Sequence, residues 1–133
     1  MLKKTYFFFM LMCTVLSSFA QTKEVALQPT ISIQPLENNL ITISGICANN
    51  TAKQQQLRYV LQVQKRSLNG NTNYNTQSGE FNLEPGNKKT LSTTSINFEP
   101  QDYTEITLTI FDTKNNQLTQ QKRLLTAQDV IKN

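Results

Sequence analysis

The chain has 133 residues and a formal net charge of +4 at pH 7, and it contains no His, no Trp and two Cys. Without His, a Ser-His-Asp triad and a His-assisted cysteine nucleophile are excluded, and zinc and copper lose their commonest ligand. No Gly-rich phosphate loop is present either. Composition therefore argues against an enzyme, a bound cofactor and a metal site.

The first twenty residues have the three-part layout of a secretory signal peptide. Lys3–Lys4 form a short positive region, Tyr6–Leu16 is apolar, and Ser18–Ala20 supplies the small residues that place cleavage before Gln21. Crossing a bilayer core of ~30 Å takes about 20 apolar residues, and this run is shorter. We therefore expect residues 1–20 to be a cleavable signal, with a periplasmic product that has no stable membrane insertion.

Removal of residues 1–20 changes the balance of charge and cysteine. The remaining 113 residues lose two lysines, which leaves eleven Lys and Arg against nine Asp and Glu, a net charge of about +2. So mild a charge does not favour a nucleic-acid partner. Cys47 becomes the only cysteine, so no internal disulfide can form. Lipidation at Cys13 is a weaker alternative to cleavage, because bulky Met12 precedes it.

Period-two alternation of apolar and polar residues, interrupted by turn signals, predicts seven strands after the signal. Residues 68–77 are predicted as an Asn-rich loop around Asn69-Gly70, and residues 126–133 as a short tail that could begin with a frayed helical turn. Short strands at this spacing predict an all-β, immunoglobulin-like antiparallel sandwich over residues 21–125, although the Cys-Trp-Cys signature of antibody domains is absent. The strands are Thr30–Gln34, Leu40–Ala48, Leu57–Ser67, Glu80–Leu83, Lys88–Phe98, Tyr103–Asp112 and Gln117–Leu125.

The side chains that could carry chemistry are few. Glu80 and Glu84 lie four residues apart around a turn, where two acids are more typical of a solvated edge than of an acid-base pair. Cys47 shares the face of Ile41 and Ile43, which favours a small core residue over a redox thiol, since no positive charge or second Cys is near it. Neither pattern predicts catalysis.

Three pairs of adjacent basic residues are the remaining charge feature: Lys65-Arg66, Lys88-Lys89 and Lys122-Arg123. Such pairs commonly mark solvated strand ends or protect a sheet edge from unwanted pairing. Alternatively, they converge on one surface and bind an acidic or amide-rich partner. The high Asn and Gln content also raises the possibility of an amyloid subunit, but no repeat of fixed period supports it.

The chain from Leu57 to Leu125 contains a series of short pieces in a fixed order. They are Gln77-Ser78-Gly79, Phe81, Leu83, Gly86, Thr90-Leu91-Ser92, Ser95-Ile96-Asn97, Asp102 and Thr107–Asp112. In order and spacing, which are more specific than any one piece, they resemble the curli-chaperone family of CsgH and CsgC. The CsgC branch of that family has a Cys-x-Cys pair where this chain has Gln55-Gln56-Leu57-Arg58, so the sequence is closer to the CsgH pattern.

This resemblance implies a periplasmic immunoglobulin-like chaperone that keeps curli-type amyloid subunits, which are Gln/Asn-rich and disordered, from forming fibres before secretion. Binding through a polar, charged sheet face and binding through an exposed edge strand both remain open. If the third and last strands share a sheet, the expected contact residues are Arg58, Lys65, Arg66, Lys122 and Arg123. The alternative is an exported adhesion or ligand-binding sandwich without catalytic activity.

Overall fold

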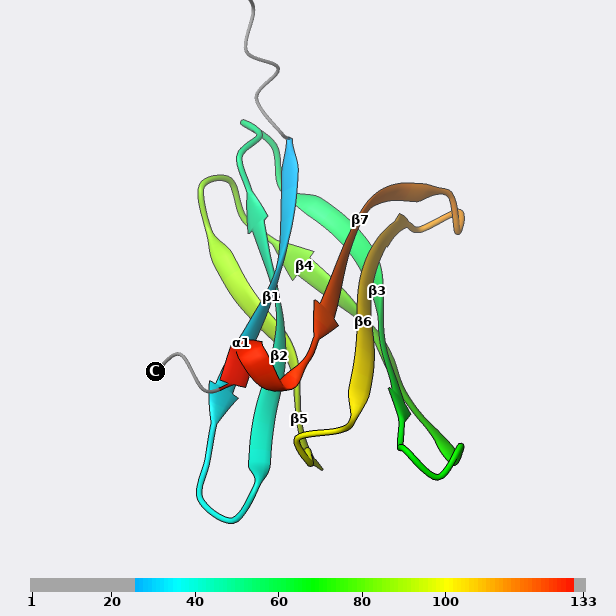
Figure 1. The fold of residues 1–133 in the computed structure, drawn as a ribbon. Coiled ribbons are helices and arrows are strands. Elements are labelled where there is room, and N and C mark those ends of the chain that lie inside the picture. The colour runs from blue at the N-terminus through cyan, green and yellow to red at the C-terminus, as the bar shows by residue number, and fades with distance from the viewer. Residues whose placement is uncertain (1–25, 131–133) are drawn as a thin grey trace, which may run out of the picture.

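The computed structural model describes residues 26–130, so the signal peptide expected at residues 1–20 and the last three residues of the tail lie outside this range. Seven strands and one short helix occupy the described range (Figure 1). They are β1 (Leu27–Pro35), β2 (Leu40–Asn49), β3 (Gln55–Arg66), β4 (Thr72–Leu83), β5 (Lys88–Asn97), β6 (Tyr103–Asp112), β7 (Gln117–Leu125) and α1 (Ala127–Val130).

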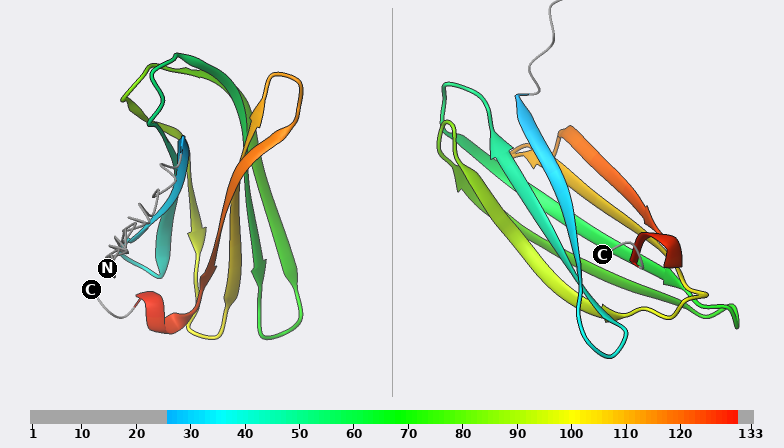
Figure 2. Two further views of the ribbon diagram at one scale, coloured as in Figure 1. Left: turned by 90° about the horizontal axis from the view of Figure 1, so that it is seen from above. Right: turned by 60° about the vertical axis from the view of Figure 1, so that its left-hand side comes forward.

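The strands form two antiparallel sheets that face each other as the two layers of a sandwich (Figure 2). One sheet has the order β1-β2-β5, and the other has the order β4-β3-β6-β7. The β1–β2, β3–β4 and β6–β7 connections are hairpins within a sheet, whereas the other connections pass between sheets. The predicted all-β sandwich of about seven strands is confirmed.

Asn and Gly at the hairpin turns make these reversals possible. Asn38 and Asn39 between β1 and β2 have φ values of 60° and 58°, Gly70 between β3 and β4 has 86°, and Asn115 between β6 and β7 has 65°. Asn and Gly are the residues that tolerate this left-handed region at least cost. The connection from β4 to β5 uses Gly86 in the same way, at 73°.

The core consists of the side chains that alternate inward from both sheets. Cys47 is fully buried among them, as predicted, and burial raises the pKa of its thiol to about 11. Gly45 faces the core at a point where the two sheets approach closely. A Cβ atom at this position would lie only 3.2 Å from Leu108 Cδ1, so there is little room for a side chain. The largest fully buried apolar side chains are Ile41, Ile43, Leu57, Leu61, Ile106, Leu108, Ile110 and Leu125.

The prediction of a loop over residues 68–77 was wrong from Thr72 onward. Residues 72–79 extend the short strand expected at Glu80–Leu83 into a twelve-residue β4, which pairs with β3 in unbroken register. Its first half is polar on both faces because it lies at the border of the sheet, so the apolar alternation begins only at Phe81. Similarly, β1 begins at Leu27 rather than Thr30, because Pro29 is tolerated in an edge strand.

Candidate functional site

The outward side of the four-stranded sheet, called here the outer face, is built from alternate residues of β4, β3, β6 and β7. The register places directly opposed residues on the same side, and the even-numbered residues of β3 and β4 point away from the core. Hydroxyls and amides surround Val60 at its centre. These are Gln62, Gln64, Thr76, Ser78, Thr107, Thr109 and Gln120.

Arg58 stands at one end of the outer face and is held in place by its neighbours. Its guanidinium lies 4.7 Å from the centroid of the Phe111 ring, a cation–π contact, and its Nε donates to Asn115 Oδ1 at 3.0 Å. Glu80 is directly opposite in the register. Arg58 is half-buried, and these two contacts orient its guanidinium.

Lys122 and Arg66 supply the other two cations of the outer face. Lys122 Nζ lies 3.3 Å from Glu105 Oε1, with side-chain exposures of 57% and 34%, so this is a solvent-accessible ion pair of small energetic value. Arg66 is the last residue of β3 and is exposed between Thr72 and Tyr103. Among the described residues, its side chain has neither a hydrogen bond nor an ion pair.

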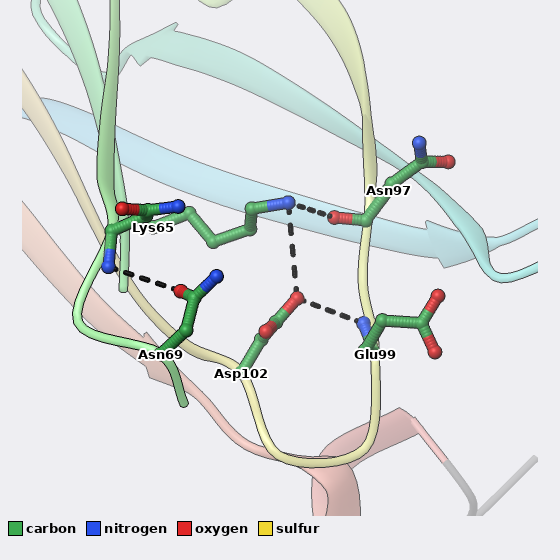
Figure 3. A network of polar contacts seen from close by, with 6 residues as sticks. Lys65, Asn69, Asn97, Glu99 and Asp102 are labelled. Carbon is green, nitrogen blue, oxygen red and sulfur yellow. Dashed lines mark hydrogen bonds and ion pairs between the residues drawn. The ribbon is translucent and has the colours of Figure 1, made fainter. Parts of the chain in front are cut away.

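The other two predicted contact residues, Lys65 and Arg123, point toward the three-stranded sheet. Lys65 Nζ donates to the Asn97 carbonyl at 2.9 Å and lies 3.8 Å from Asp102 Oδ2 (Figure 3). Arg123 Nη1 donates to the Ile31 carbonyl at 3.1 Å. The β3 and β7 strands do share a sheet, but they are separated by β6, and the five residues divide between its two sides.

Asp102 anchors the Lys65 contact in the turn between β5 and β6. Its Oδ2 accepts a hydrogen bond from the Glu99 backbone N–H at 2.9 Å, and its side chain is 5% exposed. Lys65 is 16% exposed at the side chain. Figure 3 shows this network beside Asn69, in the β3–β4 turn. The contact is thus a partly buried bridge between the layers at one end of the sandwich.

Exposed aromatic side chains on the outer face were missed at the sequence level. Tyr74 was placed in a loop, but it lies on β4, is 65% exposed and accepts a hydrogen bond from Gln64 Nε2 at 3.1 Å. Tyr103 is 39% exposed and is directly opposite Arg66. Tyr74 lies directly opposite Gln64 in the pairing of β3 with β4. Extending the predicted strand back to Thr72 would therefore have placed the Tyr74 side chain on the same face as Gln64.

The acidic residues between positions 26 and 130 do not form a reactive cluster. Glu80 lies on the outer face, whereas Glu84 is exposed in the turn after β4. Hydrogen bonds from Asn116 and the Lys114 backbone lower the pKa of Asp112, which stabilises the β6–β7 turn. In residues 26–130, no three Cys, Asp or Glu side chains are grouped so as to hold a metal ion. The single short helix of that range is neither long nor apolar enough to cross a membrane.

Comparison with known proteins relates this architecture to two solved structures. No family model and no curated protein matches the sequence. The structure of the E. coli curli protein CsgC matches with a TM-score of 0.59 and 19% identity, over 72% of this chain and 96% of that one. R. palustris CsgH matches with a TM-score of 0.55 and 15% identity, over 79% of this chain and 96% of that one.

A larger enzyme also contains a similar sandwich. The Bacteroides uniformis β-glucuronidase matches with a TM-score of 0.52 and 14% identity, over 76% of this chain but only 13% of the enzyme. At such identities the similarity concerns the fold alone, and only CsgC and CsgH among these are matched over nearly their whole length. The chain therefore has a fold like that of CsgC and CsgH.

Proposed function

We propose that this protein is a periplasmic chaperone that binds curli-type amyloid subunits and inhibits their premature assembly into fibres. The observation that carries the proposal is the CsgC- and CsgH-like fold, matched over nearly the full length of both neighbours. CsgC is a curli protein of E. coli, which supports the choice of client. The proposed binding surface is the outer face, with Arg58, Arg66 and Lys122 as its cations.

The chemistry of the outer face suits a client of this kind. A disordered Gln/Asn-rich chain has little apolar surface but many amides and backbone carbonyls. The outer face offers Gln and Thr side chains for hydrogen bonds and three cations that attract carbonyl and carboxylate oxygens. Glu80 and Glu105 reduce its net charge, so the interaction is expected to be weak and reversible.

A triple substitution of the three cations tests this assignment. Arg58→Gln, Arg66→Gln and Lys122→Gln together should weaken inhibition of fibre growth in a thioflavin assay about tenfold, since charged hydrogen bonds contribute roughly 1.5 kcal/mol or more in total. Gln is preferred to Glu because an acid at position 58 would lie opposite Glu80.

The matched control replaces three exposed lysines outside the outer face, namely Lys53, Lys88 and Lys89, by Gln. It removes the same charge and should leave inhibition intact. Equal loss of inhibition in both triple variants would mean that overall charge, and no particular face, is responsible. Unchanged inhibition in the first variant would remove these residues from the binding surface.

A second candidate function is ligand binding by an exported module, favoured by the exposed Tyr74 and Tyr103 on the same face. Exposed aromatic rings can stack on sugars. Binding of a soluble oligosaccharide that is lost in Tyr74→Ala, with no effect of the protein on fibre growth, would favour this function over the chaperone.

A further inference from the structure

The four edge strands differ in how their outward backbone groups are treated. A sheet edge presents a row of N–H and C=O groups that can pair with another chain, and proteins usually block it. The edges here are β1 and β5 in one sheet and β4 and β7 in the other. Three of them carry blocking features within the described residues, and β4 does not.

The β1 edge is closed by side chains of β7 and by proline. Gln121 Oε1 accepts a hydrogen bond from the Ile31 N–H at 2.6 Å, and Arg123 donates to the Ile31 carbonyl, so the backbone of Ile31 faces β7. Alternation then turns Pro29 and Pro35 to the same side, where they have no N–H to offer. These contacts also place β1 beside β7, which obstructs both edges.

The β5 edge is obstructed at both ends. The Asn97 carbonyl is occupied by Lys65 Nζ, and Lys88 and Lys89 stand at the beginning of the strand. The pairing of β5 with β2 is also interrupted by a bulge at Gly45 and Ile46, which disturbs the regular spacing of the strand. Lysines and bulges are both known means of preventing edge pairing.

The β4 edge is long and regular. It has twelve residues, an unbroken register, no Pro, no Lys or Arg, and only Glu80 as a charge. Asn75 Nδ2 donates to Thr94 Oγ1 on β5 at 3.3 Å, but this contact joins two side chains and occupies no backbone group of β4. The Ser67 N–H donates to the Asn71 carbonyl at 2.9 Å, which extends the β3–β4 ladder and shows that Asn71 faces β3. By alternation, the backbone groups of Thr72, Tyr74, Thr76 and Ser78 face away from β3.

We propose that the β4 edge binds an extended Asn/Gln/Ser/Thr-rich segment of the client as an added antiparallel strand, an inference that rests on the proposed function. The strand has the same chemistry as this occupant: residues 72–79 are Thr, Asn, Tyr, Asn, Thr, Gln, Ser and Gly, without a charge. Hydroxyl and amide pairs across neighbouring strands are favourable, whereas charged segments would find no partner here.

Such pairing explains how contact restrains fibre growth. In a cross-β fibre, each strand hydrogen-bonds to a chain on both sides. A client strand bound to β4 has the backbone groups of one side occupied, so no further client chain can add to that side. The outer face continues from β4 onto β3, which brings Arg66 next to Thr72 at the end of the edge. The β4 edge and the outer face therefore form one continuous binding surface.

Residue-resolved amide hydrogen exchange tests the edge directly. The probes are a curli-type subunit and a short synthetic peptide of Asn, Gln, Ser and Thr. We expect the amides of Tyr74, Thr76 and Ser78 to exchange rapidly in the free protein and to become protected with either probe. Protection confined to residues of β6 and β7, with these three unchanged, overturns the proposal.

Proline substitution supplies an independent readout. Thr76→Pro removes one outward N–H and leaves the β3 ladder in place, so it should weaken binding of the peptide about tenfold. Thr93→Pro is the matched control, because alternation from Asn97 turns its N–H outward on the β5 edge. Both variants are first checked for native amide spectra.

The outcomes separate this inference from the proposed function. Normal inhibition by Thr76→Pro, together with unprotected β4 amides, contradicts client binding at the β4 edge but not the chaperone function. Peptide binding at β4 without any effect on fibre growth supports the edge and contradicts the chaperone function. Protection of the β4 amides that rises with protein concentration in the absence of probe would identify a second copy of the chain as the occupant and overturn the proposal.

Discussion

Asn49 is a fully buried polar side chain at the end of β2 whose amide has partners on every side. Its Nδ2 donates to the carbonyls of Lys53 and Leu83, both at 2.9 Å, and its Oδ1 accepts from the N–H and hydroxyl of Thr51. The side chain thus ties the β2–β3 connection to the end of β4. Buried groups that lose a partner cost more than the bond itself contributed.

Asn49→Ala should therefore lower the free energy of unfolding by about 2–4 kcal/mol, measured by chemical denaturation. Asn82→Ala is the control: Asn82 is exposed on the same strand as Leu83, and its loss should stay within about 0.5 kcal/mol. A loss below about 1 kcal/mol for Asn49→Ala would show that solvent replaces its hydrogen bonds.

The buried thiol of Cys47 makes the free energy of unfolding depend on pH in the alkaline range. The thiol has a pKa of about 11 in the fold, raised from 9.0 by burial, so the folded state keeps the proton that the unfolded state releases above pH 9. The free energy of unfolding therefore falls as pH rises from 9 to 11, by roughly 2 kcal/mol at pH 10.5 from this group.

Denaturation of the wild type and Cys47→Ala at pH 7 and pH 10.5 measures this contribution. Other groups titrate in both proteins, so the difference between the two pH dependences isolates the thiol. Cys47→Ala should be less stable at pH 7, because it leaves a small cavity, and should lose less on going to pH 10.5. Identical pH dependences would contradict the raised pKa.

Strand bounds can be predicted from the sequence where apolar and polar residues alternate regularly. The bounds of β6 and β7 were predicted correctly, because Ile106, Leu108 and Ile110 alternate with polar residues and a turn with Asn115 follows. The first half of β4 has no such alternation, since its hydrogen bonds to β3 and not its side chains define it as a strand. Edge strands of this kind carry little signal in sequence.

The sequence specifies only in part where the five basic residues lie. Neighbouring residues of a strand point to opposite sides, so Lys65-Arg66 and Lys122-Arg123 each place one cation on either side of the sheet. This much follows from sequence, because Leu61 and Val63 mark Lys65 as inward. The Asp102 and Ile31 partners depend on how the sheets stack, which no local pattern specifies.

The inward position of Lys65 leads to a prediction about the bridge between the layers. Lys65→Met keeps the apolar stem but leaves Asp102 without its cation, and should cost about 1–3 kcal/mol in denaturation experiments. Lys122→Met, which loses only the exposed pair with Glu105, should cost about 0–1 kcal/mol. Equal costs would mean that the Lys65 pair behaves as a surface pair.

The β-sandwich is held together by packing, and it has a polar outer face, three obstructed sheet edges and one open edge. Cys47 is the only cysteine in the described residues and is buried, so no disulfide contributes within them. The open β4 edge adjoins the hydroxyl- and amide-rich outer face, and both suit a client that offers backbone and amide groups. This arrangement is the physical basis of the proposed chaperone.

The most direct measurement is thioflavin-monitored fibre growth of a curli-type subunit with purified residues 21–133 added at substoichiometric amounts. The proposed function predicts that the lag before fibre growth lengthens with each addition, while an unrelated sandwich protein of similar charge has no effect. Fibre growth that is unchanged even at equimolar protein would contradict it.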